Sequence, residues 1–224
     1  MTTPIPNPAQ RPRADATKDA LIRAAVAVFG RDGFQAASTR AIAQEAGVNQ
    51  ALIKYHFANK QGLYDAAIQS IADRMGTEVL PIFHAIEANR VEDDPAASLF
   101  ALKRMLGAMI GLLAREDAAN WAQLIVREQQ SPGPAFLKIY DGIMAPALTT
   151  MARLVNVLDP AGRLGDPKLL VITLVGQVLV LRVAHATMMR FVGWDRIGDK
   201  ELEEIRARIG RNLDRLFAET EHAP

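Results

Sequence analysis

The chain has 224 residues, of which 50% are hydrophobic and 23% are charged. This balance is typical of a globular protein with a sizeable core and excludes a largely disordered chain. Lysine and arginine number 26 against 25 aspartates and glutamates, so the net charge of +1 points to no class of partner. Cysteine is absent, which excludes disulfides, thiolate metal sites and cysteine nucleophiles and suits a cytoplasmic protein.

We expect neither a secretion signal nor a membrane span. The N-terminal segment is rich in proline and has no apolar run, unlike a secretory signal. The longest apolar run, residues 169–181, is interrupted by Thr173, Gly176 and Gln177 and is shorter than the roughly 20 residues that cross a bilayer. We therefore predict a soluble, cytoplasmic protein without a membrane partner.

The first part of the chain predicts an arm followed by a helix. Residues 1–14 contain four prolines with Arg11 and Arg13, and such a segment has little to bury, so we expect a flexible basic arm. The apolar residues that follow, up to Gly33, recur at helical spacing; they are Leu21, Ala25, Val28 and Phe29.

Three further helices are predicted from their capping residues. Ser38 is a suitable N-cap for a short helix that ends at Gly47, and Asn49 for a helix of about two turns. Asn59 is a suitable N-cap for a longer helix that runs towards Pro81. We expect this helix to stop at Pro81, because proline disfavours a helical residue before it.

The remainder of the chain predicts long helices separated by proline and glycine. These stretches are roughly 96–130, 135–158, 167–191 and 200–219. Alternating β patterns are missing, so we predict an all-α protein. It would consist of a smaller helical domain at 15–66, followed by a larger helical bundle at 67–224.

Residues 38–57 carry the informative motif. Two short helices joined at Gly47, with Ile42, Val48 and Ile53 as apolar contacts, fit a helix-turn-helix. From this spacing alone, an ordinary αα-hairpin remains equally open. Residues 1–66 hold eight Lys and Arg against five Asp and Glu, which weakly favours nucleic acid at this end.

A family resemblance favours DNA binding. The stretch from Thr17 to Leu63 resembles the DNA-binding domain of the TetR-type transcriptional repressors. The matching residues are Ala25, Phe29, Gly33-Phe34, Ser38-Thr39-Arg40, Ile42-Ala43, Ala46-Gly47-Val48, Tyr55-His56-Phe57, Asn59-Lys60 and Leu63. A weaker similarity to the subgroup with a CecR-type C-terminal domain rests on Arg127-Glu128-Gln129, Gly176-Gln177-Val178 and Gly193-Trp194.

The predicted DNA-contacting residues are Thr39, Arg40, Asn49, Gln50, Ala51, Lys54, Tyr55, His56 and Lys60. Thr39 and Arg40 open a helix whose amides face a phosphate. Gln50 suits adenine and Ala51 a thymine methyl group, while Lys60 matches the family's phosphate-contacting lysine.

Three further positions leave alternatives open. Lys54 stands where many relatives carry an aromatic residue, and it suits phosphate or guanine. His56 is either structural or a base reader. Arg11 and Arg13 are either minor-groove contacts or solvated charges.

The resemblance implies a three-helix helix-turn-helix DNA-binding domain at 15–66 and a larger helical-bundle ligand and dimerisation domain at 67–224. The helices of the second domain would hold a small-molecule effector. Methionine and aromatic side chains there are either core or the adaptable walls of a pocket. Charged residues within apolar stretches either pair with one another or orient a ligand. The candidate pocket residues are Met105, Met109, Trp121, Arg127, Glu128, Phe136, Arg182 and His185.

The sequence therefore predicts a homodimeric repressor that dimerises through 167–191 and 200–219. A small-molecule effector would release it from a palindromic double-stranded DNA operator. The alternative is an effector-independent DNA-associated structural protein of the same fold. The four histidines form no metal-binding pattern and no catalytic motif is present, so we expect neither an enzyme nor a metal or other cofactor.

Overall fold

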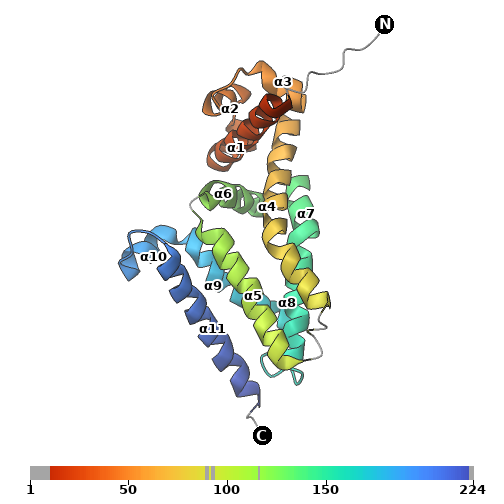
Figure 1. Cartoon of the computed structure of the whole chain (residues 1–224), viewed down its shortest axis with the longest axis vertical. Coiled ribbons are helices and arrows are strands. Elements are labelled where there is room, and N and C mark those ends of the chain that lie inside the picture. The colour runs from red at the N-terminus through yellow and green to blue at the C-terminus, as the bar shows by residue number, and fades with distance from the viewer. Residues whose placement is uncertain (1–10, 89–90, 92–93, 116, 222–224) are drawn as a thin grey trace. The chain divides into compact units, whose positions relative to one another are not determined.

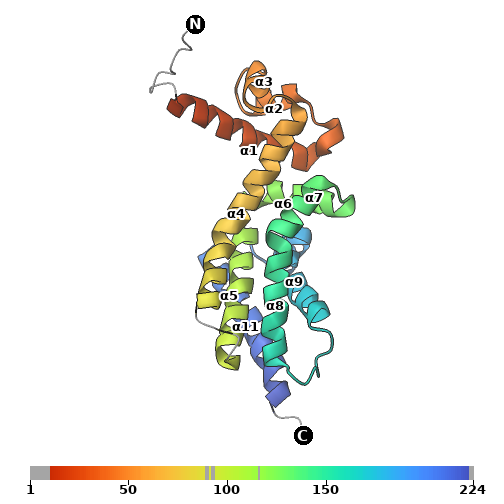
Figure 2. The same ribbon diagram turned by 90° about the vertical axis from the view of Figure 1, so that its right-hand side faces the viewer.

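The structure is a computed structural model that describes residues 11–88, 91, 94–115 and 117–221. These residues form helices and no strand (Figures 1 and 2), so the all-α prediction is confirmed. The chain divides into two compact units. The N-terminal unit holds the residues up to Asp73 together with Asn120–Ile139, and the C-terminal unit holds Arg74–Ala119 and the residues from Tyr140 onwards.

The N-terminal unit starts with α1 (Arg11–Ala36), which bends where Gly33 adopts a φ of +79°. It continues with α2 (Thr39–Glu45), α3 (Ala51–Phe57) and the first part of α4 (Lys60–Ala88). The helix α7 (Pro134–Ile139) and most of α6 (Ala118–Gln130) complete it.

The start of α1 differs from the expected arm, because residues 11–14 are helical. Pro12 is compatible with this start, since the first turn of a helix needs no N–H from it. The rest of the expected arm, and the side chains of Arg11 and Arg13, lie outside the described residues.

The core of the N-terminal unit contains the predicted apolar stripe of α1. All four of its residues are buried, as are Leu63 and Tyr64 of α4. The rings of Phe29 and Phe34 both meet the Tyr64 ring edge-on, with centroids 4.9 Å apart in each pair. A Cβ on Gly62 would overlap the carbonyl oxygen of Phe57, so glycine is required in the first turn of α4, next to the end of α3.

The C-terminal unit is a helical bundle built around α5 (Pro95–Ala114). This helix packs against α8 (Ala145–Leu158), α9 (Pro167–Val183) and α11 (Asp199–Glu221). A π-helical segment, η3 (Tyr140–Met144), leads into α8, and α10 (His185–Val192) follows α9.

Three predicted helix boundaries were wrong. α4 continues through Pro81 to Ala88, where Ile82 and Ile86 beyond the proline are buried and hold the helix against the bundle. The expected helix 96–130 is two helices, because Arg115 adopts an extended backbone after α5. The expected helix 167–191 breaks at Ala184, where the sequence offers no helix-breaking residue.

The helix α5 is more apolar than the sequence analysis recognised. The helix has 20 residues, and its most apolar window of 18 residues has a mean hydropathy of 1.5, which would suffice for a membrane span, as would α9 and α10 taken together across their 84° bend. About 44% of the most apolar α5 window is buried inside the bundle. The core helix of a bundle has the same composition as a membrane span.

Candidate nucleic-acid interface

The helices α2 and α3 form a compact pair held by buried apolar residues. Ile42 and Ala43 of α2 and Ile53 and Phe57 of α3 are buried. Gly47 takes a φ of +66° in the turn, a left-handed conformation that glycine adopts without strain. The pair therefore has the geometry of the predicted helix-turn-helix.

The predicted cap of α2 is present, whereas the N-cap of α3 is Gln50, one residue after the predicted Asn49, whose side chain still accepts from the first turn. The Ala41 N–H donates to Ser38 Oγ at 3.0 Å, and the Ala51 N–H donates to Asn49 Oδ1 at 2.8 Å. Asn49, one of the predicted DNA-contacting residues, therefore also fixes the start of α3.

The outward face of α3 and its flanks carries the polar residues that the sequence analysis selected. Arg40, Gln50, Ala51 and Lys54 are exposed, and Tyr55 is 78% exposed. His56 is half-buried, with its ring edge-on to Tyr55 at a centroid distance of 4.9 Å. A helix with one buried and one exposed polar face is what insertion into a major groove requires.

Two of the residues predicted to contact DNA, Gln50 and Lys60, form hydrogen bonds within the protein. Gln50 Nε2 donates to Thr39 Oγ1 at 2.8 Å, which joins the start of α3 to the start of α2. Lys60 Nζ donates to the Gln35 carbonyl at 3.2 Å and lies 4.6 Å from the centroid of the Phe34 ring. Lys60 therefore anchors the start of α4 to the end of α1.

Comparison with known proteins identifies the family. A family model described as "Bacterial regulatory proteins, tetR family" matches residues 21–67. The model for the C-terminal domain of the "HTH-type transcriptional dual regulator CecR" matches residues 100–220. The CecR regulator of Shigella flexneri is 32% identical over 217 residues, which cover 94% of this chain and 96% of that protein. The chain belongs to the TetR family of transcriptional regulators.

Solved structures of transcriptional regulators share this fold. HlyIIR, a hemolysin II transcriptional regulator, aligns with a TM-score of 0.58 at 18% identity and covers 87% of this chain and 97% of its own. A TerR/AcrR-family regulator from Aquifex aeolicus aligns with a TM-score of 0.54 at 18% identity and covers 89% and 99%. The predicted resemblance, both to the family and to its CecR-type subgroup, is confirmed.

In this TetR-family chain, α6 is joined to the DNA-binding helices by close backbone contact. Arg127 donates from Nε to the Gly30 carbonyl at 2.7 Å and from Nη2 to the Arg31 carbonyl at 2.6 Å. A Cβ on Gly30 would lie 2.5 Å from the carbonyl oxygen of Asn120. Glycine is therefore required where α1 and α6 approach.

A second contact joins α6 to α4. The Tyr64 hydroxyl donates to Glu128 Oε1. Burial, together with this hydrogen bond and the carboxylate charge, raises the pKa of Tyr64 above its ordinary value. The phenol therefore stays protonated as a donor. Arg127 and Glu128, adjacent in sequence, thus fix α6 to two different helices of the DNA-binding region.

The Trp121 side chain has a buried donor without a partner. This residue is only 4% exposed, and its Nε1 makes no hydrogen bond among the described residues. Buried indole N–H groups usually find an acceptor. Trp121 is thus the one candidate pocket residue of the described chain whose polar atom is buried and unsatisfied.

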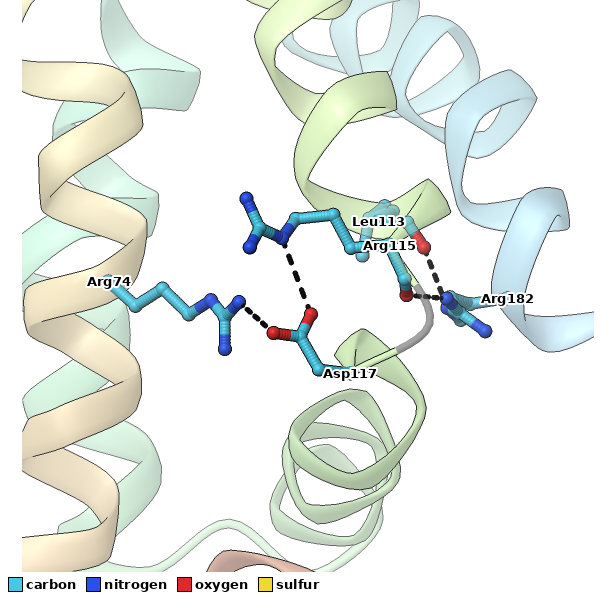
Figure 3. Close-up of polar contacts among 5 residues, drawn as sticks. All are labelled: Arg74, Leu113, Arg115, Asp117 and Arg182. Carbon is cyan, nitrogen blue, oxygen red and sulfur yellow. Dashed lines mark hydrogen bonds and ion pairs between the residues drawn. The ribbon is translucent and has the colours of Figure 1, made fainter. Parts of the chain in front are cut away.

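Arg182 caps the C-terminal end of α5 (Figure 3). Its Nε donates to the Leu113 carbonyl at 2.6 Å and its Nη2 donates to the Arg115 carbonyl. Burial lowers the pKa of Arg182 below its ordinary value, and the Asp117 charge opposes this. A cation over the last carbonyls of a helix is favourable.

Asp117 lies beside this cap, at the break between α5 and α6. Its carboxylate accepts hydrogen bonds from Arg74 of α4 and, at 3.3 Å, from Arg115 (Figure 3). Sequence reasoning missed Arg74 and Asp117, because neither lies in a recognisable motif. The sequence also has no proline or glycine at this point to indicate that α5 ends and α6 begins.

The eight candidate pocket residues divide between the two units. The N-terminal unit contains Trp121, Arg127, Glu128 and Phe136, and the C-terminal unit contains Met105, Met109, Arg182 and His185. Met105 is buried in α5, and His185 Nδ1 lies 3.1 Å from the Leu181 carbonyl. None of the eight lines either of two described grooves in the C-terminal unit, of about 560 and 400 Å³.

Proposed function

We propose that the chain is a homodimeric repressor that binds a near-palindromic operator and leaves it when a small-molecule effector binds. The observation that carries this proposal is the exposed polar face of α3 and its N-cap, which presents Gln50, Lys54 and Tyr55. The opposite face of α3 is fixed by buried Ile53 and Phe57. Two copies would read half-sites one helical turn apart, about 34 Å centre to centre. The protein would act in the cytoplasm and catalyse no reaction.

Dimerisation is supported by an apolar face on α9. Leu169 is 65% exposed, and Ile172, Val180 and Val183 are also exposed. Their spacings of 3, 8 and 3 residues place them on one side of the helix, together with Gly176, around whose Cβ position there is open space. Monomeric proteins rarely leave such a contiguous patch in water, and a two-fold interface uses the same patch from both copies.

The dimer is tested by sedimentation of matched charge variants. Ile172→Asp places one negative charge in the apolar face and should convert the dimer to a monomer at micromolar concentration. Asn156→Asp adds the same charge at an exposed position of α8 and should leave the dimer intact. A wild-type chain that sediments as a monomer contradicts the proposed assembly.

Effector binding is supported by the unsatisfied Trp121 indole. A buried donor without a partner costs about 1–3 kcal/mol, which an acceptor on an effector would recover. Trp121→Phe removes the donor but keeps an aromatic ring. The variant should fold at least as stably and bind the operator unchanged without effector, yet need more effector for release.

The decisive experiment is selection of bound sequences from random duplex DNA, followed by a compound screen for release. A winning palindrome with two half-sites supports the repressor. If no compound shifts the melting temperature or releases the DNA, the effector-independent structural protein is the better description. If no sequence is enriched, sequence-specific DNA binding is wrong.

A further inference from the structure

The helices α5 and α11 run antiparallel, side by side, along a seam in the C-terminal unit (Figures 1 and 2). At one end, Lys103 of α5 pairs with Asp214 of α11. At the other end, Arg206 lies against Gly111, because a Cβ on Gly111 would stand 3.1 Å from Arg206 Nη2. These two contacts fix the register of the seam.

Two glycines lie in the middle of the seam. Gly107 of α5 and Gly210 of α11 both line it, and a Cβ on either would meet no heavy atom within 4 Å. The result is a groove of about 400 Å³, hereafter the α5–α11 groove, which lies within the usual size range of small-molecule sites. Its floor consists of buried apolar residues, namely Leu106, Ile110, Ile209 and Leu213.

The charged residues that line the α5–α11 groove are all cations. They are Lys103, Arg104 and Arg206. Lys103 already has its carboxylate partner, Asp214, and the Arg104 guanidinium lies 5.9 Å from the centroid of the Phe100 ring. Arg206 forms no ion pair with a described residue, so it is the cation most available to an anion.

The wall of the groove adds a further apolar surface, because Phe100 lines it and is 64% exposed. Lys103 and Gly111 are eight positions apart on α5, so the stretch between the two end contacts is about 12 Å long at 1.5 Å per helical residue. An extended medium-chain alkyl group matches this length. The floor thus suits an alkyl chain, while the cationic rim suits an anionic head group.

We propose that the α5–α11 groove binds a single-chain anionic amphiphile, specifically a free medium-chain carboxylate. The alkyl chain lies over Gly107 and Gly210, and the carboxylate accepts hydrogen bonds from Arg206. This binding site goes beyond the repressor function, since it requires neither DNA nor release from an operator.

The test uses calorimetric titration of the full chain, without DNA, with decanoate and with uncharged decanol below their aggregation limits. Wild-type protein should bind one decanoate per chain and bind decanol more weakly. Added salt should weaken decanoate but not decanol, because it screens the rim charges. Absence of decanoate binding to the folded wild-type chain overturns the proposal.

Three variants separate the groove from the rest of the surface. Gly107→Leu fills the open space and should weaken decanoate binding at least about tenfold, and Gly210→Leu repeats the test from α11. Arg206→Gln should weaken decanoate by about tenfold while leaving decanol unchanged. Arg208→Gln makes the same charge change at a position that does not line the groove and should have no effect.

Two results contradict the proposal. If decanoate binds a folded Gly107→Leu or Gly210→Leu variant as tightly as it binds wild type, its binding site is not the α5–α11 groove. Sedimentation of the same variants supplies the second criterion. If filling the groove dissociates the dimer, a second copy occupies this surface and the carboxylate site is wrong.

Discussion

Gln50 and Thr39 are joined by a hydrogen bond in which Gln50 Nε2 donates to Thr39 Oγ1 at 2.8 Å. A glutamine amide has two N–H donors and one acceptor oxygen. Reading adenine requires one donor and the oxygen, so the contact with Thr39 leaves the adenine-reading pair available. Thr39 therefore orients the amide of Gln50 at the start of α3.

This relationship yields a prediction on base readout. Gln50→Ala should reduce discrimination at one base pair per half-site by about 1–3 kcal/mol. Thr39→Val removes the hydroxyl but keeps the branched shape, and it should cause a smaller loss at the same base pair. Competition between operator variants measures both effects. If Gln50→Ala weakens all sequences alike, Gln50 is not the base reader.

A second prediction concerns the two lysines near the interface. Lys60→Ala should weaken binding to all sequences and reduce the salt dependence by about one unit per site. Because Lys60 also bonds to the Gln35 carbonyl, the variant should lose about 1 kcal/mol of folding stability. Exposed Lys54 is the matched control, and Lys54→Ala should change salt dependence without changing the melting temperature. An unchanged salt slope in Lys60→Ala would leave Lys60 with the anchoring role alone.

A third prediction tests the attachment of α6 to α4. Tyr64→Phe keeps the ring against Phe29 and Phe34 but leaves Glu128 without its donor, which should cost about 1–3 kcal/mol of folding free energy. Combining it with Glu128→Ala, which removes the acceptor, should cost less than the two single losses together, because each single variant already removes the same hydrogen bond. Chemical denaturation measures the cycle. Fully additive losses would show that the two side chains are not coupled.

Acid stability gives a fourth prediction, centred on Asp117. Burial raises the pKa of Asp117, but the hydrogen bonds and charges of Arg74 and Arg115 outweigh it and hold that pKa below the ordinary value. The stabilisation is thus present above about pH 4 and is lost as the pH falls through the depressed pKa. The Asp117 side chain is 53% exposed, so the gain is at most about 1 kcal/mol. Wild type should melt above Asp117→Asn at neutral pH, and the two should converge below about pH 3; a constant gap would exclude the ion pairs as its source.

The helix-turn-helix could be predicted from sequence because its signals are local. Ser38, Gly47 and Asn49 act within a few residues of their own position, and the apolar spacing specifies which face is buried. The breaks at Arg115 and Ala184 could not be predicted. These breaks depend on residues distant in the sequence, such as Arg182, whose side chain caps α5. No proline or glycine at either break indicates it in the sequence.

The charged candidates show the same limit. Arg127 and Arg182 were expected either to pair with carboxylates or to orient a ligand. Both instead donate to carbonyl groups, at Gly30 and Leu113 respectively. Every residue has a backbone carbonyl, so the sequence does not show which carbonyl an arginine will bond. A hydrogen bond from an arginine to a carbonyl can be recognised only when the positions of the helices are known.

The fifth prediction concerns Gly76, which lies in α4 three residues beyond Asp73, where the helix passes from one unit to the other. A Cβ on Gly76 would lie 3.6 Å from Leu80 Cδ1 and 3.8 Å from Ile143 Cδ1, which are ordinary contact distances. Alanine therefore fits, and it should stabilise the helix by up to about 1 kcal/mol. Gly62 in the same helix is the contrast, because a Cβ there would overlap the Phe57 carbonyl and Gly62→Ala should destabilise the DNA-binding helices.

If α4 transmits the effector signal, stiffening it at Gly76 should alter coupling more than DNA affinity. Gly76→Ala should leave operator affinity within about threefold without effector but change the effector concentration that causes release, since coupling energies are typically about 1–3 kcal/mol. Fluorescence anisotropy on the selected operator measures both quantities. The chain passes between the units at three places, one of them in α4 and one within α6. A folded Gly76→Ala dimer with an unchanged effector response would therefore contradict a role for Gly76 in the coupling and leave the two other passages, within α6 and after α7, as its routes.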